Sequence, residues 1–299
     1  MNTTTRGWLQ GLIGVAIFSG SLPATRLAVA GFDPLLLTAL RATIAGGLAL
    51  MVLLALRPST PARGDWPGLA LGAAGVVLAF PLLTALALQH ITAARSIVFI
   101  GLLPLATALF GVLRGGERPR PAFWLFALAG SACVAAFAGY QAPDQASAAT
   151  TRGDLLMIAA VAACGYGYAE GGRLSRRLGG WQVICWMLVL ALPAMAGWSL
   201  LAPAPDWSGI PLPAWLGLAY VSLFSMLIGF VFWYRGLALG GIAAVGQLQL
   251  LQPFLGLVLA AWLLHEPVSP AMLAATLGVV ACVAAARRLA AAAPQRSPT

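Results

Sequence analysis

Long apolar runs of about 20 residues follow one another along the chain and are separated by short polar connections. A helix of about 20 apolar residues is long enough to cross a lipid bilayer. The pattern therefore predicts an all-α polytopic membrane protein with ten transmembrane helices. We expect these spans at residues 8–30, 35–56, 66–88, 92–113, 122–140, 153–174, 181–201, 214–234, 242–264 and 270–289.

The composition supports lipid as the surrounding solvent. Hydrophobic residues make up 61% of the chain and charged residues 8%, whereas a soluble domain carries about 25% charged residues. The arginines that give the net charge of +9 lie between the apolar runs and form no basic face, so the charge predicts no nucleic-acid partner. Frequent alanine, glycine and arginine, with no lysine, favours a GC-rich bacterial source and hence the bacterial inner membrane.

The arginines also predict the orientation, because cytoplasmic loops of membrane proteins are enriched in Lys and Arg. If the N-terminus is cytoplasmic, only Arg26, Arg41, Arg95 and Arg152 of the 17 basic residues fall on the outer side. We therefore expect both termini in the cytoplasm. The first run has features of a signal peptide, but we interpret it as a retained helix, since its removal would leave nine spans and break the repeat described next.

Two stretches at the ends of the two halves are nearly the same: LAGSACVAA at 128–136 and LGVVACVAA at 277–285. The same offset of 149 residues aligns Pro104 with Pro253, Glu117 with Glu266, and Pro121 with Pro270. Each half thus holds five spans, and because five is odd, the second half enters the membrane from the opposite side. Inverted repeats are typical of secondary transporters, which bind substrate near the membrane midplane between the halves.

This repeat predicts the organisation of the chain. We expect residues 1–140 to form the first five-helix repeat, 141–152 a periplasmic linker, 153–289 the second, inverted repeat, and 290–299 a cytoplasmic tail. In this arrangement the glutamate of the first repeat lies at the cytoplasmic side and that of the second at the periplasmic side. We expect Glu117 and Glu266 to cap helices five and ten near their N-termini.

The stretches PLATALFGVLRGGE and PFLGLVLAAWLLHE, the segment LRATIAGGLAL at 40–50 and the five-plus-five layout resemble the drug/metabolite transporter superfamily. The chain is most similar to its ten-helix type made of two EamA repeats, including bacterial exporters of aromatic and other amino acids. The resemblance implies a central cavity lined mainly by helices 1, 3, 4, 6, 8 and 9, a small-molecule substrate, no ATPase domain and no cofactor. It favours a monomer in the bilayer.

We therefore expect a secondary transporter that exports amino acids, with apolar or aromatic ones among them, and related metabolites by alternating access. The alternatives are a multidrug or other metabolite transporter of the same fold, a channel, and an intramembrane enzyme. The chain has no GxxxxGK[ST] loop for ATP and no HExxH or GxSxG motif for catalysis. A channel usually needs a selectivity filter or a ring of charges, often from several subunits, and inverted repeats within one chain fit alternating access better.

Polar groups inside spans are costly and are therefore functional candidates. Glu170 has two interpretations: it couples protons or holds a substrate ammonium, or it forms a structural pair with Arg173. Tyr166 lies four residues earlier on the same helical face and is a second candidate. Gln249 is a candidate for hydrogen bonds to an amino acid, with hydrogen bonding between helices as the alternative.

Further candidates share a position at the expected depth of the cavity. We expect substrate contacts from Ser19, Phe80, Thr84, Ser96, Phe99, Phe230 and Trp233, although ordinary packing explains any one of them. Pro23, Pro104 and Pro253 are the hinge candidates, because proline removes a backbone donor and weakens a helix locally. Arg41 and Arg95 are expected to snorkel to headgroups, with attraction of a carboxylate at the outer mouth as the alternative.

Overall fold

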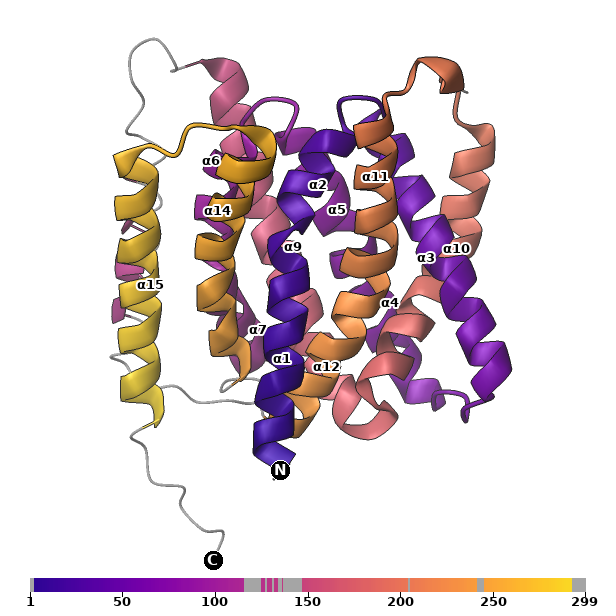
Figure 1. Cartoon of the computed structure of the whole chain (residues 1–299). Helices are drawn as coiled ribbons and strands as arrows, with labels where there is room; N and C mark the ends of the chain where they lie inside the picture. Colours follow the sequence, from indigo (N-terminus) through magenta and orange to yellow (C-terminus); the bar gives the residue numbers. More distant parts are fainter. Residues whose placement is uncertain are drawn as a thin grey trace, which may run out of the picture.

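The computed structural model describes residues 3–115, 125–126, 128–130, 132–133, 136, 147–203, 205–240 and 245–291. These residues form a bundle of helices that run broadly along one axis (Figure 1). Among them, seven helical segments are long and apolar enough to cross a membrane, and Leu248–Leu264 and Pro270–Cys282 are shorter apolar helices. The predicted all-helical membrane architecture is confirmed at this level.

The first half supplies the following elements in chain order: α1 (Thr3–Ser19), α2 (Ser21–Ala28), α3 (Pro34–Leu56), η1 (Arg63–Asp65), α4 (Trp66–Ala73), η2 (Ala74–Ala79), α5 (Phe80–Ala87), α6 (Ala93–Ile100) and α7 (Leu103–Gly115). They cover the first four predicted spans. The fifth predicted span and Glu117 lie largely or wholly outside the described residues, and the described part of 125–136 is helical.

The second half supplies α9 (Ala148–Leu178), α10 (Gly180–Leu201), η3 (Trp207–Gly209), α11 (Leu212–Tyr220), η4 (Val221–Ile228), α12 (Gly229–Gly240), η5 (Gln247–Leu251), α14 (Gln252–Leu264) and α15 (Pro270–Ala291). α9 begins five residues before the predicted start at 153, because Ser147 caps it by accepting a hydrogen bond from the Thr150 amide at 3.1 Å. The start of α1 and the end of α15 lie at the same end of the bundle (Figure 1).

Five of the predicted spans are interrupted within the described residues: the first breaks at Gly20, between α1 and α2, and the other four form two pairs. The third and eighth contain π-helical turns, η2 and η4. The fourth breaks between α6 and α7, just before Pro104, and the ninth has the 3₁₀ segment η5 just before Pro253. Proline lacks the amide that would continue the helix, so each new helix starts close to its proline. The same two kinds of interruption therefore occur at corresponding spans of the two halves.

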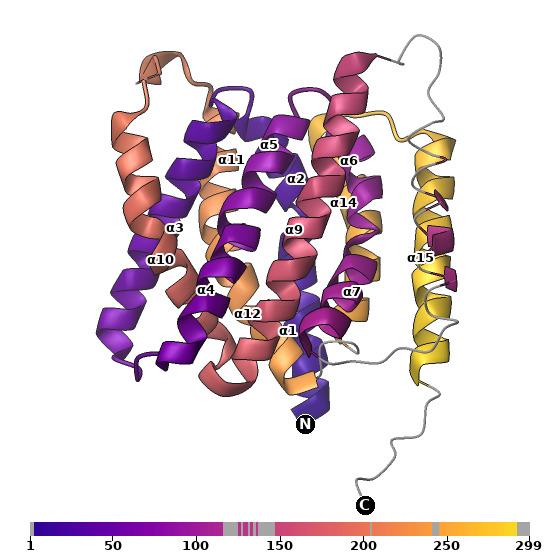
Figure 2. The same ribbon diagram turned by 180° about the vertical axis from the view of Figure 1, so that it is seen from behind.

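Contacts between the halves follow a reciprocal pattern. α1 packs along α12, and its counterpart α9 packs along α4, η2 and α5. α3 packs along α10, at one edge of the bundle, and α15 forms the opposite edge in both views (Figure 1 and Figure 2). At that edge, a Cβ on Gly278 of α15 would lie 3.2 Å from Cys133 Sγ, and a Cβ on Gly130 would lie 3.4 Å from Cys282 Cβ. At the level of whole helices, exchanging the halves converts the packing of α1 on α12 into that of α9 on α4, η2 and α5, and leaves the packing of α3 on α10 unchanged.

Glycine allows the closest of these approaches. A Cβ added to Gly236 of α12 would lie 2.7 Å from the backbone nitrogen of Gly11 on α1. Both helices carry a GxxxG spacing here, with Gly7 before Gly11 and Gly240 after Gly236. Small residues at this spacing let two backbones touch within a membrane. This contact places the aromatic residues of α1 and α12 side by side next to the cavity described below.

Candidate functional site

A small, partly enclosed cavity lies where the two halves meet. It is lined by Phe18, Ser21, Leu22, Arg41, Val76, Phe80, Ile100, Tyr168, Ser225, Phe230 and Gln252. These residues come from spans one to four of the first half and from spans six, eight and nine of the second. The expected lining helices are all represented, and α3 is an addition. The cavity volume is about 20 Å³, enough for about one water molecule, so the site is contracted in this conformation.

One side of the cavity is aromatic. The ring of Phe18 lies edge-on to Phe230 with 5.0 Å between centroids, and Tyr168 lies edge-on to Phe230 at 5.8 Å. Trp233 packs behind them, 5.5 Å from the Tyr168 ring. Offset and edge-to-face geometry at these distances is favourable between aromatic rings. Three of the rings, Phe18, Tyr168 and Phe230, line the cavity, and Trp233 supports them from behind, so this wall suits an apolar or aromatic group.

The other side of the cavity is polar. The hydroxyls of Ser21 on α2 and Ser225 on η4 hydrogen bond to each other at 2.7 Å. Gln252, at the start of α14, is buried, and its side-chain oxygen has no partner among the described residues. Ser225 lies in a π-helical turn, which widens the helix and is frequent at functional sites. Hydrogen-bonding groups from both halves thus converge on this side.

Arg41 completes the polar side, and its position corrects the expectation of snorkelling. Its exposed fraction is only 4%, and it lines the cavity from α3. Its Nη2 atom donates to the Val221 carbonyl at 3.3 Å and to Ser225 Oγ at 3.4 Å. Its Nε has no hydrogen-bond partner, and no described Asp or Glu forms an ion pair with it. The guanidinium therefore points toward the cavity, whereas the sequence pattern had predicted that Arg41 would point toward the lipid headgroups.

Of the predicted substrate contacts, Phe80 and Phe230 line the cavity. Ser19, Thr84 and Ser96 are buried, and each hydroxyl donates to a backbone carbonyl within its own span, at 2.8–3.0 Å. This is the usual way in which a hydroxyl within an apolar helix satisfies its donor. In this conformation the three side chains support their own helices.

The other predicted contacts also lie away from the cavity. Phe99 and Trp233 are fully buried, and Tyr166 packs edge-on against Phe110 at 5.4 Å. Gln249 is 1% exposed, and neither its side-chain oxygen nor its nitrogen has a partner within the described part of the chain. Gln252, on the same helical face but a turn further along the chain, is the glutamine that reaches the cavity.

Glu170 forms ion pairs at one end of the bundle. Its carboxylate accepts from Arg173 Nη2 at 2.6 Å and from Arg114 Nε at 3.4 Å, and it is fully buried. Arg114 belongs to α7 of the first half, so the contact joins the halves. Asp65 and Arg177 make a second ion pair between the halves near the same end. Glu170 is not among the residues that line the cavity.

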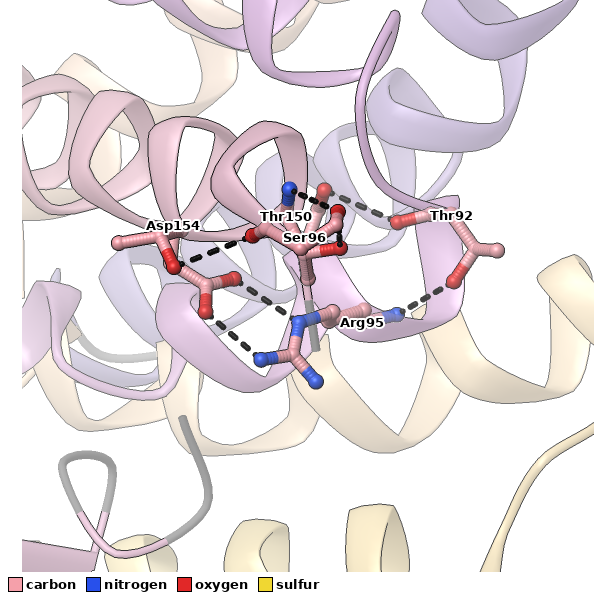
Figure 3. Close-up of polar contacts among 7 residues, drawn as sticks. Thr92, Arg95, Ser96, Thr150 and Asp154 are labelled. Carbon is pink, nitrogen blue, oxygen red and sulfur yellow. Dashed lines mark hydrogen bonds and ion pairs between the residues drawn. The ribbon is translucent and has the colours of Figure 1, made fainter. Parts of the chain in front are cut away.

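The opposite end of the bundle has its own set of contacts. Arg95 on α6 binds Asp154 on α9 through two hydrogen bonds, Nε to Oδ1 at 2.9 Å and Nη2 to Oδ2 at 2.7 Å (Figure 3). Arg95 therefore does not snorkel as expected. Two parallel hydrogen bonds to a carboxylate are the strongest arrangement open to arginine. The side chain is held between the two halves by this geometry.

Glu266 lies at this end too, and it caps a different helix from the one expected. Its two carboxylate oxygens accept from the amides of Ala93 at 3.1 Å and Ala94 at 2.8 Å, in the first turn of α6. The expectation was a cap on helix ten, α15. The connection before α15 instead reaches across to the other half, where unpaired amides and the helix dipole favour a negative charge.

The hinge candidates lie next to helix interruptions. Pro104 follows the break at 101–102, and Pro253 follows η5. Pro23 is buried inside α2, three residues after Gly20, where α1 ends. Tyr220 donates to the Ile17 carbonyl at 2.7 Å beside this break. Their role in motion stays a prediction.

Comparisons with known proteins identify the family. The model of the EamA-like transporter family matches residues 5–137 and again 151–287. The chain is 64% identical to the uncharacterized transporter YdeK of Bacillus subtilis over 290 residues, 97% of this chain and 100% of that protein. A probable terminal-alkyne amino-acid exporter of Streptantibioticus cattleyicolor is 25% identical, over 93% of this chain and 92% of that one.

A solved structure, described as the crystal structure of a protein, shares the fold with a TM-score of 0.68 at 24% identity, covering 96% of this chain and 98% of the other. The two family matches together span most of the chain and divide it into the same halves as the sequence repeat. The chain belongs to the EamA-like transporter family, within the drug/metabolite transporter superfamily, and is a multi-pass membrane transporter and not an enzyme.

Proposed function

We propose that the protein is a secondary transporter that exports amino acids with apolar or aromatic side chains, and related metabolites, across the bacterial inner membrane by alternating access. The observation that carries this proposal is the small cavity between the halves, lined by aromatic rings and by Arg41 and two serine hydroxyls. Such a cavity matches a molecule with an apolar body and one charged polar end.

The proposed mechanism uses ten transmembrane helices in two inverted repeats, with the halves at 1–140 and 153–289, a linker at 141–152 and a tail at 290–299. Three observations support this mechanism: the sequence repeat at an offset of 149 residues, the reciprocal contacts between helices of the two halves, and the paired interruptions of spans three, four, eight and nine. Inverted repeats allow a shared site to open to either side by rocking one half against the other.

The contacts at the two ends supply the closures that such a cycle needs. At one end, Glu170 with Arg114 and Asp65 with Arg177 link the halves. At the other end, Glu266 holds the start of α6, and Arg95 binds Asp154. Opening toward either side has to break one set and can leave the other in place. In this account, the contracted cavity with both sets formed corresponds to an occluded state.

The orientation and the substrate class rest on separate observations. The ten-span topology predicted from the sequence puts most of the arginines on the same side as the two termini, which supports a cytoplasmic location for both ends. Export of amino acids is supported by the distant relative whose description is a probable terminal-alkyne amino-acid exporter. The aromatic wall favours amino acids with apolar side chains within that class.

Counterflow into proteoliposomes tests this proposal. Liposomes that contain the purified protein are loaded with unlabelled phenylalanine, leucine or glutamate, and uptake of the same radiolabelled amino acid is followed, with protein-free liposomes as the control. We expect saturable counterflow of phenylalanine and leucine and none of glutamate. Unsaturable flux together with ionic conductance would support a channel and overturn the proposal, as would the absence of counterflow for all three.

A further inference from the structure

Arg41 has no counter-charge among the described residues around it. The described residues that line the cavity include no Asp or Glu, and neither of its two hydrogen bonds is shorter than 3.3 Å. Within the part of the chain that the structure describes, its Nε is buried without a partner. A buried cation inside a membrane normally pairs with an acid or with backbone carbonyls, because an unpaired charge there is costly. The described protein atoms offer Arg41 no acid and only two long hydrogen bonds, so they compensate little of this cost.

The symmetry of the scaffold also argues against a purely structural charge. Arg41 lies on α3, and α3 packs along its counterpart α10. α10 contains no charged residue between Gly180 and Leu201. If the charge served the packing of this helix pair, the second half would need an equivalent. Of these two helices, only α3 carries a charge within its span, and that charge is on a residue that lines the cavity.

The groups around Arg41 suit an anion better than a cation. The guanidinium presents five N–H donors in a plane that matches a carboxylate. The hydroxyls of Ser21 and Ser225 can turn to donate to the same group. A ligand ammonium finds weaker recognition, from the unpaired oxygen of Gln252 and the faces of the aromatic rings.

We propose that Arg41 is the anchor for the carboxylate of the substrate, and that the site therefore accepts apolar monocarboxylates with or without an α-amino group. This inference rests on the proposed function and makes it narrower. The carboxylate pairs with Arg41 at the serine side of the cavity, and the apolar body lies against Phe18, Tyr168 and Phe230. The amine adds little to the binding, and an aromatic amine without a carboxylate is excluded by the charge of Arg41.

Four ligands of one shape separate these contributions: phenylalanine, 3-phenylpropionate, phenethylamine and phenylalaninamide. The first readout is the thermal unfolding of the purified protein in detergent with each ligand, and the second is inhibition of phenylalanine counterflow. We expect 3-phenylpropionate to act within about threefold of phenylalanine in both readouts. We expect phenethylamine and phenylalaninamide to be at least about tenfold weaker, the scale of a lost charge-assisted hydrogen bond.

The variant Arg41→Gln tests the anchor itself. We expect 3-phenylpropionate to stabilise the wild-type protein and to lose at least about tenfold in apparent affinity for the variant. Arg235→Gln is the matched control, because it removes the same charge from an exposed side chain in the middle of α12. The ligand series in the wild-type protein keeps the test decisive should Arg41→Gln fold poorly.

The two proposals fail in different ways. If no amino acid shows counterflow but 3-phenylpropionate stabilises the wild-type protein and not Arg41→Gln, the amino-acid transport proposal is wrong and the carboxylate anchor stands. If counterflow is seen but phenethylamine or phenylalaninamide competes as well as phenylalanine, the anchor is wrong. Absence of stabilisation by both carboxylates, or unchanged affinity in Arg41→Gln, also overturns it.

Discussion

Glu266 connects the two halves at the end of the bundle that we propose to be periplasmic, and replacing it tests whether this contact holds that side closed. The carboxylate accepts from the Ala93 and Ala94 amides at 3.1 and 2.8 Å. Glu266→Gln keeps the shape of the side chain and one acceptor oxygen but removes the charge. We therefore expect the open state on this side to become more populated while the fold is retained.

The magnitude follows from these contacts. A hydrogen bond to a charged group contributes about 1.5–3 kcal/mol and a neutral one about 1 kcal/mol. A carboxylate at a helix N-terminus adds about 0.3–1 kcal/mol. Arg26, whose Nε lies 3.9 Å away and whose side chain is 39% exposed, adds little. The substitution loses one charged hydrogen bond, weakens the other and removes the dipole contribution, so it costs the closed state at least about 2 kcal/mol, or at least about a 30-fold shift in population.

Cysteine accessibility measures this shift. Ser21→Cys places a thiol in the cavity wall, and a membrane-impermeant maleimide is applied from the Glu266 side to oriented vesicles. The same protein without Ser21→Cys gives the background from native cysteines. We expect Glu266→Gln to raise the labelling rate at least about 10-fold when the open state is rare in the parent protein. Asp206→Asn is the matched control, because Asp206 is exposed in the connection before α11 and caps only its own turn. A rate for Glu266→Gln within twofold of this control would refute the reasoning.

Three further substitutions test the wall, the packing and the ion pairs. Phe18→Leu removes three aromatic contacts at similar volume, so the KM for phenylalanine counterflow should rise about 3- to 10-fold while that for leucine stays within twofold. Gly236→Ala should destabilise the protein by about 1–3 kcal/mol in thermal unfolding, because the new methyl group meets the backbone of α1, whereas Gly47→Ala, with open space around it, should not. Glu170→Gln should lower thermal stability by about 1–3 kcal/mol and leave the pH dependence of flux unchanged, because its carboxylate is held by two arginines away from the cavity; a lost pH dependence would instead assign it to proton coupling.

The sequence pattern was sufficient for the helices that run straight through the bundle. The second and seventh predicted spans, 35–56 and 181–201, agree within one residue with α3 and α10. The interruptions were less accessible, because a run of apolar residues looks the same whether the helix is regular, π-helical or broken. Pro104 and Pro253 marked two of the breaks, but nothing in the apolar pattern around 221–228 distinguished η4 from an α-helix.

The site was harder to predict than the fold, and three residues show why. Arg41 was placed by its distance from the helix end, which says nothing about whether a side chain faces lipid or the partner helix. Tyr166 was chosen because it shares a face with Glu170, but that face meets arginines, and Tyr168 on another face reaches the cavity. Ser225 lies in a π-helical turn, where faces counted at 3.6 residues per turn no longer apply.

The most direct test of the central claim is the rate at which radiolabelled phenylalanine leaves preloaded proteoliposomes, with and without unlabelled phenylalanine outside. In alternating access, the binding site has to turn back toward the inside of the liposome after each release of substrate. This return is faster when the site carries substrate, because an empty site leaves the Arg41 charge unpaired. The account predicts that external phenylalanine accelerates efflux and that the acceleration saturates. Efflux that is slowed or unaffected by external phenylalanine, with a rate that grows in proportion to the internal concentration, would contradict it.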